Sequence, residues 1–348
     1  MLPQVFIDHK RVRQNLERVF HNPLFSNINF RPHFKTHQSV ETGRVFREFG
    51  IDKITVSSFP MAEYFANDGW QDIMIAIPIN PADSGSYSKL ADKISLHLLV
   101  DSAEAAEIAM NQIQNSVTFH IKCDCGYGRA GIPAQNKERF SEIIKLFRTY
   151  TNHDFGGLVS HFGNSYHLDE KGIFDINLSG TSDLRNLKTY LETLHGLNCS
   201  ISIGDTPSLR LYNDEILNEI DEIRPGNFVY YDVMQFLAGH CQITDIAAAL
   251  EVPFLSLYPE RNEVLVHGGA VHLSKESCPM PDGKIGYGVA IRLSENGIGE
   301  VIQGAFVDRL SQEHGILRVQ PGFFNEFKPG DSIGILPVHS CLMVSAMK

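Results

Sequence analysis

Short apolar runs alternate with amphipathic stretches between about residue 26 and residue 232. Several of the runs are nearly continuous in Val, Ile, Leu and Phe, which is typical of strands that are buried on both faces of a parallel sheet. The stretches between them have apolar residues at helical spacing, such as Val45, Phe46 and Phe49 within 39–49. The pattern predicts eight strands, at 28–35, 53–59, 72–79, 95–101, 117–126, 155–163, 200–206 and 222–232.

Eight strand-helix units in roughly 200 residues predict a (β/α)8 barrel of the TIM type. The last unit is the weakest, because its helical stretch, 209–220, is short and polar. An open doubly wound sheet is the alternative, but no Gly-x-Gly-x-x-Gly follows the first strand to support it. We therefore expect a barrel, with its site at the carboxyl ends of the strands.

After about residue 236 the pattern changes to strands without helices between them. Turn sequences such as Pro281-Asp282-Gly283 and Pro329-Gly330-Asp331 separate these strands. We predict a barrel domain over 10–235 and an all-β domain over 236–348, with residues 1–9 as a candidate addition to the second. Its predicted strands are 253–258, 263–267, 285–293, 301–310, 316–319 and 331–336.

Composition narrows the functional classes. Of the 348 residues, 43% are hydrophobic and 20% are charged, which is ordinary for a globular protein and excludes a disordered or fibrous one. The formal net charge of −11, with no cluster of Lys and Arg, argues against a nucleic-acid partner. The sequence has neither a bilayer-spanning segment nor a signal-peptide pattern, so we expect no membrane partner and a cytoplasmic location. In that compartment the six cysteines should be thiols or ligands.

Polar residues gather at the predicted carboxyl ends of the strands. Lys35 closes the first strand, and an apolar approach through Ile28, Phe30 and Phe34 would desolvate its ammonium and favour the neutral amine. A lysine after a strand is usually just an exposed side chain, but these neighbours make Lys35 a candidate for a Schiff base with a carbonyl cofactor. The other polar residues expected at this edge are Asp124, Arg129, His161, Tyr166 and those of 204–208.

The loops after the seventh and eighth strands occupy the positions that usually cradle phosphate in such barrels. They are Gly204-Asp205-Thr206-Pro207 and Arg224-Pro225-Gly226-Asn227. Taken alone, the first is more simply a turn, because Gly, Asp and Pro favour turns. Its position after the seventh strand favours a binding role. The residues predicted to bind phosphate are Gly204, Thr206, Gly226 and Asn227.

A metal site is predicted near the end of the chain. On an extended strand, His339 and Cys341 would point the same way and could hold a tetrahedral ion whose other positions are open, as in catalytic sites. A structural histidine and a buried thiol are the alternative. Glu313 and His314 are either partners of these ligands or surface polar residues. Cys123-Asp124-Cys125 is either a ligand pair or two packed thiols.

Several motifs together resemble the eukaryotic-type D-serine dehydratase and D-threonine aldolase family, whose pyridoxal phosphate fold joins an alanine racemase-like barrel to a C-terminal β domain. The resemblance covers almost the full length of the chain. The motifs are Pro-His-x-Lys-Thr-His at 32–37, Asp-Cys-Gly-x-Gly-Arg-x-Gly at 124–131, His-x-Gly-Asn-Ser-Tyr at 161–166, Gly-Asp-Thr-Pro at 204–207, Arg-Pro-Gly-Asn-Phe-Val-Tyr-Tyr-Asp at 224–232, Gln-Glu-His-Gly at 312–315 and Pro-x-His-Ser-Cys at 337–341.

The resemblance implies that Lys35 forms the internal aldimine with pyridoxal phosphate and that Tyr166 approaches its pyridine nitrogen. It also implies that His339 and Cys341 bind zinc. A cysteine ligand favours the dehydratase branch, since an oxygen ligand would suit the Mn²⁺ or Mg²⁺ of the aldolases; Mn²⁺ is the alternative ion. Relatives of this fold usually pair, so a homodimer is expected. The residues expected to contact the cofactor are Lys35, Arg129, His161, Tyr166, Gly204, Thr206, Gly226 and Asn227.

The implied reaction is β-elimination from a D-3-hydroxy amino acid, with D-serine as the first candidate and pyruvate and ammonia as products. The metal would polarise the β-hydroxyl, which is otherwise a poor leaving group. The alternatives are a D-threonine aldolase-type lyase, a D-3-hydroxyaspartate dehydratase, an amino acid racemase and a non-catalytic pyridoxal phosphate carrier. His267-Gly268-Gly269 stands where the family has an Asp-Ala-Gly-like run, so the preferred substrate stays open. The roles of His33, His37 and His267 stay open as well.

Overall fold

The computed structural model describes residues 2–280, 283–294 and 297–348. The chain divides into two compact units. One, called the barrel unit here, consists of residues 20–35 and 39–226; the other, called the C-terminal unit, consists of residues 1–19, 36–38 and 227–348. The turn predicted at Pro281-Asp282-Gly283 lies partly outside the described residues.

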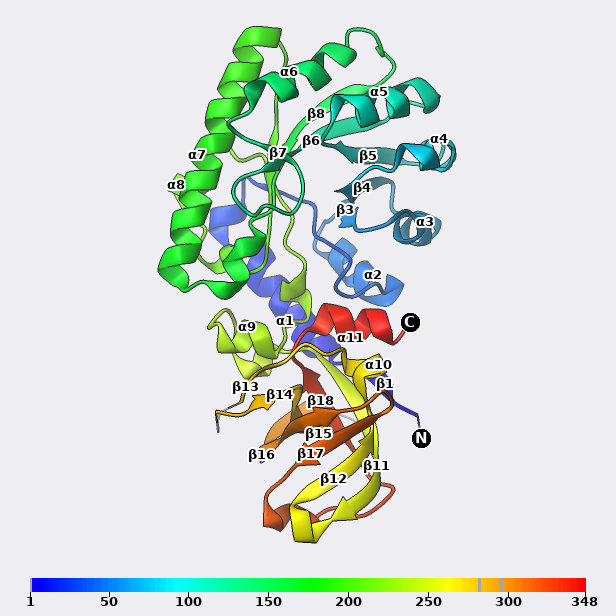
Figure 1. The fold of residues 1–348 in the computed structure, drawn as a ribbon, viewed down its shortest axis with the longest axis vertical. Coiled ribbons are helices and arrows are strands. Elements are labelled where there is room, and N and C mark those ends of the chain that lie inside the picture. The colour runs from blue at the N-terminus through cyan, green and yellow to red at the C-terminus, as the bar shows by residue number, and fades with distance from the viewer. Residues whose placement is uncertain (1, 281–282, 295–296) are drawn as a thin grey trace. The chain divides into compact units, whose positions relative to one another are not determined.

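The barrel unit has the predicted ring of parallel strands (Figure 1). Among the described residues, eight strands follow one another in the order β2-β10-β9-β8-β6-β5-β4-β3, and a parallel bridge between His33 and Thr55 joins the two ends of this order. The nearly closed (β/α)8 barrel predicted from the sequence is therefore confirmed. The strands are β2 (Asn29–Phe30), β3 (Lys53–Val56), β4 (Asp72–Pro78), β5 (Ser95–Val100), β6 (Thr118–Asp124), β8 (Asp154–Val159), β9 (Ile201–Ile203) and β10 (Glu222–Ile223), and β7 (Ile132–Pro133) pairs with β6 outside this order.

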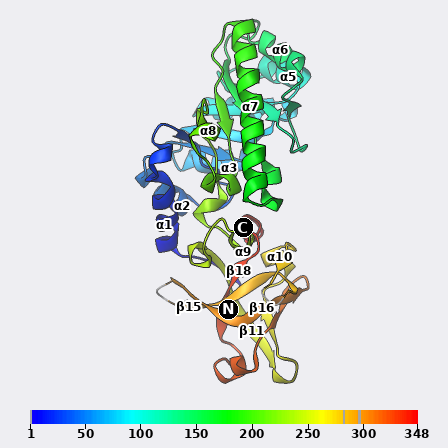
Figure 2. The ribbon, with the colours of Figure 1, turned by 90° about the vertical axis from the view of Figure 1, so that its left-hand side faces the viewer.

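Side-chain caps fix where the helices of the barrel unit begin. Ser39, Ser58 and Ser102 each accept a hydrogen bond from a backbone N–H in the first turn of the helix that follows. Asp169 caps the 26-residue helix α7 in the same way (Figure 2). The helices are α2 (Val40–Glu48), α3 (Phe59–Asn67), α4 (Ser84–Ala91), α5 (Ala103–Gln112), α6 (Lys137–Leu146), α7 (Glu170–His195) and α8 (Asp214–Leu217). Helix α1 (His9–Phe20) belongs to the C-terminal unit except for its last residue.

The strands next to the expected site are shorter than predicted. β2 ends at Phe30 and β10 ends at Ile223, so Lys35 lies in a turn and Gly226 lies beyond its strand. Prolines at 32 and 225 lack the N–H that would continue each ladder. Beyond the regular strands, the two segments are still joined by a backbone hydrogen bond: the N–H of His33 donates to the carbonyl of Pro225 at 2.9 Å. The helix of the last strand-helix pair is short, as predicted, because α8 has only four residues.

The C-terminal unit is built on an antiparallel sheet (Figure 1). Its order is β1-β11-β12-β17-β16-β15-β18, and β18 also pairs with β11, which closes the sheet on itself. Its core contains Val252, Val264, Leu317 and Ile335, all fully buried. The strands are β1 (Gln4–Ile7), β11 (Ala248–Tyr258), β12 (Glu263–His267), β15 (Gly288–Ser294), β16 (Gly297–Leu310), β17 (His314–Arg318) and β18 (Ser332–Pro337), beside the hairpin of β13 (Cys278–Pro279) and β14 (Ile285–Gly286).

The extended strand predicted for His339 and Cys341 is wrong. β18 ends at Pro337, and Cys341 lies in the first turn of helix α11 (Ser340–Ala346), with His339 as its N-cap residue. The buried carboxylate of Asp232 accepts the backbone N–H of Ser340 at 3.1 Å, which satisfies one of the free donors at the helix start. The short helices α9 (Val233–Leu237) and α10 (Ala270–Leu273) also belong to this unit. No helix within the described residues is long and apolar enough to cross a membrane.

Candidate active site

The turn that carries Lys35 is anchored by an aromatic cluster. Phe34 is fully buried, and its ring centroid lies 5.0 Å from those of Phe46, Phe65 and Trp70. The backbone of Thr55 holds this segment by two hydrogen bonds. The N–H of Phe34 donates to the carbonyl of Thr55 at 2.8 Å, and the N–H of Thr55 donates to the carbonyl of Pro32 at 2.9 Å. The backbone on the N-terminal side of Lys35 is therefore fixed, so its amine extends from a rigid turn.

Positive charge surrounds two neutral histidines in the barrel unit. Burial lowers the pKa of His33 well below its usual value, and the charges of Lys35 and Arg224 lower it further. Burial also lowers the pKa of His161 to about 3, although its Nδ1 donates to the carbonyl of Gly204 at 2.5 Å, which opposes the shift. Both rings are thus neutral at pH 7. The basic side chains that contribute to one or both of these shifts are Lys35, Lys122, Arg129 and Arg224.

Lys122, on β6, is a buried amine. Burial lowers its pKa to about 7, and the nearby guanidinium of Arg224 adds to the effect. Arg224 itself is held by the barrel: it donates to the carbonyl of Ser160 at 2.6 Å and to the hydroxyl of Ser202 at 2.8 Å. The barrel unit therefore has a preorganised positive region, which suits a ligand carrying phosphate or carboxylate groups.

Asp124 organises the loop that precedes Arg129. Its Oδ1 accepts hydrogen bonds from the N–H groups of Gly126, Tyr127 and Gly128 at 3.1, 2.9 and 3.0 Å. The ring of Tyr127 lies between two predicted site residues, with its centroid 5.0 Å from the Arg129 guanidinium and 5.9 Å from the His161 ring. Sequence reasoning missed Tyr127, although it falls within the Asp-Cys-Gly-x-Gly-Arg motif.

The predicted phosphate loop after β9 is packed against the end of β10. A Cβ atom at Gly204 would lie 2.8 Å from the backbone of Arg224, so only glycine allows this close approach. Asp205 accepts the N–H of Ser208 and the hydroxyl of Ser165, both at 2.8 Å. This second bond ties the loop to the 3-10 turn 163–167 that carries Tyr166. The structure therefore brings Gly204, Thr206 and the Tyr166 turn into one loop cluster.

Asn227 lies in the C-terminal unit, and its side chain contacts one of the predicted metal ligands, Cys341. Its Nδ2 donates to Asp232 at 2.8 Å and to Ser340 at 3.1 Å, and it lies 3.6 Å from the sulfur of Cys341. The side chain of Asn227 therefore serves this cluster, and a role in phosphate binding would fall to its backbone.

His339 and Cys341 are in contact, as the metal prediction requires. Burial opposes a charge on His339, but its hydrogen bond to Cys341 and the Asp232 carboxylate outweigh burial and raise the pKa of His339. The hydroxyl of Thr36 lies 3.2 Å from the Cys341 sulfur, and both side chains are buried. An imidazole next to a thiol with hydrogen-bonding neighbours is a donor set that suits zinc. Thr36 directly follows Lys35 in the chain.

The remaining candidate motifs lie elsewhere. The sulfurs of Cys123 and Cys125 are 3.9 Å apart, and the Ser160 hydroxyl donates to Cys125 at 3.4 Å, so the two thiols are packed neighbours. His314 is exposed, and Glu313 is exposed beside His267. All six cysteines belong to the described residues and are free thiols.

Known proteins are similar to this chain over both of its units. Residues 7–233 match the family model "Alanine racemase, N-terminal domain", and residues 247–348 match "Putative serine dehydratase domain". The chain is 30% identical to a D-serine dehydratase of Dictyostelium discoideum, over 98% of this chain and 90% of the relative. It is 28% identical to a D-threo-3-hydroxyaspartate dehydratase of a Delftia species, over 97% and 90% of the two chains.

The solved structure of the Delftia enzyme is also similar, with a TM-score of 0.89 and 25% identity over 99% of this chain and 92% of that one. Structures of D-threo-3-hydroxyaspartate dehydratase variants with a histidine or a cysteine replaced by alanine match as well, and the cysteine variant is described as metal-free. The two replaced positions are two residues apart, which is also the spacing of His339 and Cys341. Since both units and nearly the full length are matched, this chain belongs to the D-serine dehydratase family, with an alanine racemase-type barrel.

Proposed function

We propose that this protein is a pyridoxal phosphate-dependent lyase that converts D-serine to pyruvate and ammonia. The observation that carries the proposal is the presence, within one chain, of an anchored amine in a positively charged barrel unit and a histidine-cysteine donor pair in the C-terminal unit. Curated relatives at 24–30% identity are dehydratases of D-3-hydroxy amino acids, which supports the reaction class.

The barrel residues fit the cofactor. When bound, pyridoxal phosphate takes up the electron pair that is released at the substrate's α-carbon. Lys35 would supply the amine that links to it and then accept the α-proton. The backbone at Gly204, Thr206 and Gly226 would hold the phosphate, since the close packing of Gly204 against the backbone of Arg224 brings the loops after β9 and β10 together. Arg129 and the neutral ring of His161 would border the cofactor, and Tyr166 would face its pyridine nitrogen.

The donor pair fits a metal. His339 and Cys341 would hold a divalent ion, and zinc is the proposed one, because a thiolate and an imidazole are its common ligands while Mn²⁺ prefers oxygen. The ion would act as a Lewis acid on the departing hydroxyl. Thr36 and Asn227 would orient the Cys341 sulfur by their contacts of 3.2 and 3.6 Å.

A second substrate is favoured by the charge of the barrel unit. Arg224 is a buried cation, and Lys122, whose pKa is lowered to about 7, can hold its proton when an anion binds beside it, so D-threo-3-hydroxyaspartate, with its additional carboxylate, is the second candidate. The likeness to the Delftia enzyme supports the same choice. A retro-aldol lyase for D-threonine is less well supported, because Cys341 provides sulfur where a harder ion would need oxygen.

Product analysis tests these assignments. Purified protein loaded with pyridoxal phosphate would be incubated with D- and L-serine, D-threo-3-hydroxyaspartate and D-threonine, after chelation and after return of Zn²⁺ or Mn²⁺. We expect pyruvate from D-serine that is lost on chelation and restored by Zn²⁺. Oxaloacetate from hydroxyaspartate at a higher kcat/KM would move the assignment to the second candidate. Glycine without keto acid would refute a dehydratase.

Two variants separate the two groups of residues. Lys35→Ala should remove the cofactor's Schiff-base absorbance and all keto acid, while the metal content stays the same. Cys341→Ser should retain the absorbance and lose the metal and the activity. Loss of absorbance in Cys341→Ser, with the fold intact, would contradict the separate roles.

We also propose that the protein is a cytoplasmic homodimer. The expected dimer rests on the resemblance to this fold family, and light scattering of the purified protein would test it by giving a mass of twice 39.0 kDa. Six free thiols support a reducing compartment.

A further inference from the structure

Two motifs that the proposed function does not use lie side by side in the C-terminal unit. They are His267-Gly268-Gly269, after β12, and Gln312-Glu313-His314, before and at the start of β17. His267 pairs with His314 in the β12–β17 ladder. Backbone hydrogen bonds continue past that pair: Gly268 donates to Glu313 at 3.0 Å and Ala270 donates to Ser311 at 2.8 Å.

These segments approach so closely that only glycine fits at position 269. A Cβ atom there would lie 2.3 Å from the carbonyl oxygen of Gln312. The next backbone bond, from Val271 to Gln312 at 3.2 Å, fixes the start of α10 against the same loop. The strand end, the short helix and the loop therefore form one backbone framework, which positions the side chains it carries without help from a ligand.

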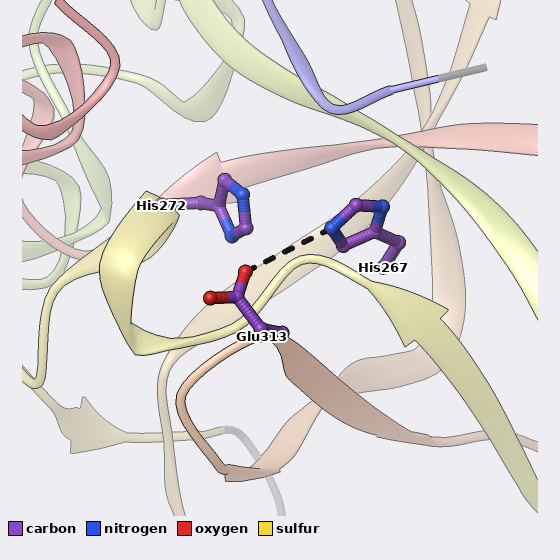
Figure 3. A group of neighbouring side chains, drawn as sticks. All are labelled: His267, His272 and Glu313. Atoms are coloured by element: carbon purple, nitrogen blue, oxygen red, sulfur yellow. Dashed lines mark ion pairs between the residues drawn. The ribbon is translucent and has the colours of Figure 1, made fainter.

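Three potential ligands extend from this framework toward one another (Figure 3). His267, His272 and Glu313 each offer one nitrogen or oxygen atom, and these three atoms all lie within 4.8 Å of one another. His267 Nε2 is 3.9 Å from a carboxylate oxygen of Glu313. In a tetrahedral zinc site, with bonds of about 2.0–2.2 Å, ligand atoms are roughly 3.3 Å apart, so small side-chain rotations would close the set.

The three side chains are exposed enough for an ion to enter. His267 is 27% exposed and Glu313 is 47% exposed, so the cluster opens to solvent and water can fill the remaining coordination positions. The two imidazole rings are perpendicular, with centroids 5.3 Å apart, and are not stacked against each other. Their nitrogens can therefore face a common point.

One existing contact competes with an ion. His272 Nδ1 accepts the N–H of Gly269 at 3.1 Å, which places the ring proton on Nε2 in the neutral tautomer. Coordination by either nitrogen requires the ring to give up that hydrogen bond. Glu313 Oε1 accepts a hydrogen bond from the exposed side chain of Gln312 at 3.2 Å, whereas its Oε2 is the oxygen that lies 3.9 Å from His267 and can face an ion.

We propose that His267, His272 and Glu313 form a second metal site that binds a divalent transition-metal ion of the zinc class. Two imidazoles and one carboxylate are a donor set that zinc commonly takes, with one position left to water. The ion would link the end of β12 and helix α10 to the loop before β17. The alternative is a surface ion pair between His267 and Glu313 beside a helix cap. The inference does not depend on the proposed function, because it concerns ligands separate from His339 and Cys341.

Zinc stoichiometry tests the proposal. The full-length protein, loaded with pyridoxal phosphate and freed of any polyhistidine tag, would be stripped of metal and dialysed against buffered Zn²⁺. We expect two zinc ions per chain for the wild type and one for Cys341→Ser. Glu313→Gln and His267→Ala should each bind one in the wild-type background. His314→Ala, an exposed histidine next to Glu313, is the matched control and should still bind two.

In Glu313→Gln and His267→Ala, the zinc affinity of the second site, measured by chelator competition, should fall by at least about 10–100-fold. That is the loss expected when a partner outside the ligand set of a metal site is removed, and a ligand should matter at least as much. Co²⁺ gives an independent signal: in Cys341→Ser its visible bands should persist without thiolate charge transfer, and they should vanish in the double variant Cys341→Ser/His272→Ala. If Glu313→Gln and His267→Ala still bind as much zinc as the wild type, with equal affinity, the proposal is refuted. The same holds if zinc binding is lost entirely with Cys341.

Discussion

The hydroxyl of Thr36 provides a direct test of how this protein would hold its metal. Thr36 is fully buried, and its Oγ1 lies 3.2 Å from the Cys341 sulfur. Thr36→Val removes the hydroxyl and leaves a methyl group of similar size. A hydrogen bond to a charged acceptor such as a thiolate contributes about 1.5–3 kcal/mol, whereas a neutral one contributes about 0.5–1.5 kcal/mol. The difference, about 1–1.5 kcal/mol, is the part that metal binding gains from the hydroxyl, so at about 1.4 kcal/mol per factor of ten the variant should bind zinc about 5–12-fold more weakly.

The assay is chelator competition for Zn²⁺ on protein loaded with pyridoxal phosphate. Thr181→Val is the matched control, because Thr181 is also fully buried but donates to the carbonyl of Leu178 within α7. Both variants should unfold at somewhat lower urea concentrations than the wild type, since each loses one buried hydrogen bond. Only Thr36→Val should lose metal affinity. An unchanged zinc affinity in a folded Thr36→Val protein would show that this hydroxyl does not support the ligand.

Three further predictions concern the barrel unit. Gly204→Ala should destabilise the protein by more than about 1 kcal/mol and reduce cofactor absorbance, because its methyl would collide with backbone; Gly85→Ala, whose Cβ meets nothing within 4 Å, is the control in urea unfolding. Asp124→Ala removes the acceptor of three N–H groups in 126–128, so the dissociation constant for pyridoxal phosphate, measured by fluorescence titration, should rise with little change in kcat of the saturated enzyme. An unchanged dissociation constant would contradict a positioning role. His161, whose pKa is lowered to about 3, stays neutral in the folded protein while the unfolded chain protonates below about pH 6.5, so stability should fall as pH decreases through this window, by up to about 1.4 kcal/mol per pH unit. The free energy of unfolding of His161→Gln, measured in urea between pH 4 and pH 7, should fall less steeply than that of the wild type. An identical slope would refute the assignment.

The sequence pattern was sufficient for the architecture and insufficient for the strand ends. Apolar continuity located all eight barrel strands, and β12 has the predicted bounds, Glu263–His267. Phe59, predicted as the end of a strand, belongs to α3, because the hydroxyl of Ser58 caps that helix. Pro32 and Pro225 end regular pairing where apolar content alone would continue it. Local periodicity therefore gave the elements, while caps and missing N–H groups determined where they stop.

The site was predicted in part for the same reason. The motif spacing identified His339 and Cys341 as a pair, and they are in contact. Their place at a helix start depends on Asp232, which is 108 positions from Ser340 in the chain, so no local pattern could show it. The contact of Thr36 with Cys341 spans 305 positions and was missed for that reason. Contacts between distant segments become visible only once the fold is known.

The chain passes between its two units at the residues that carry the proposed chemistry. Lys35 belongs to the barrel unit and Thr36, the next residue, to the C-terminal unit; Gly226 and Asn227 divide in the same way. Thr36 and Asn227 are also the two side chains that contact the Cys341 sulfur. Each predicted cofactor residue at these crossings is therefore joined by one peptide bond to a residue that supports the predicted metal ligand.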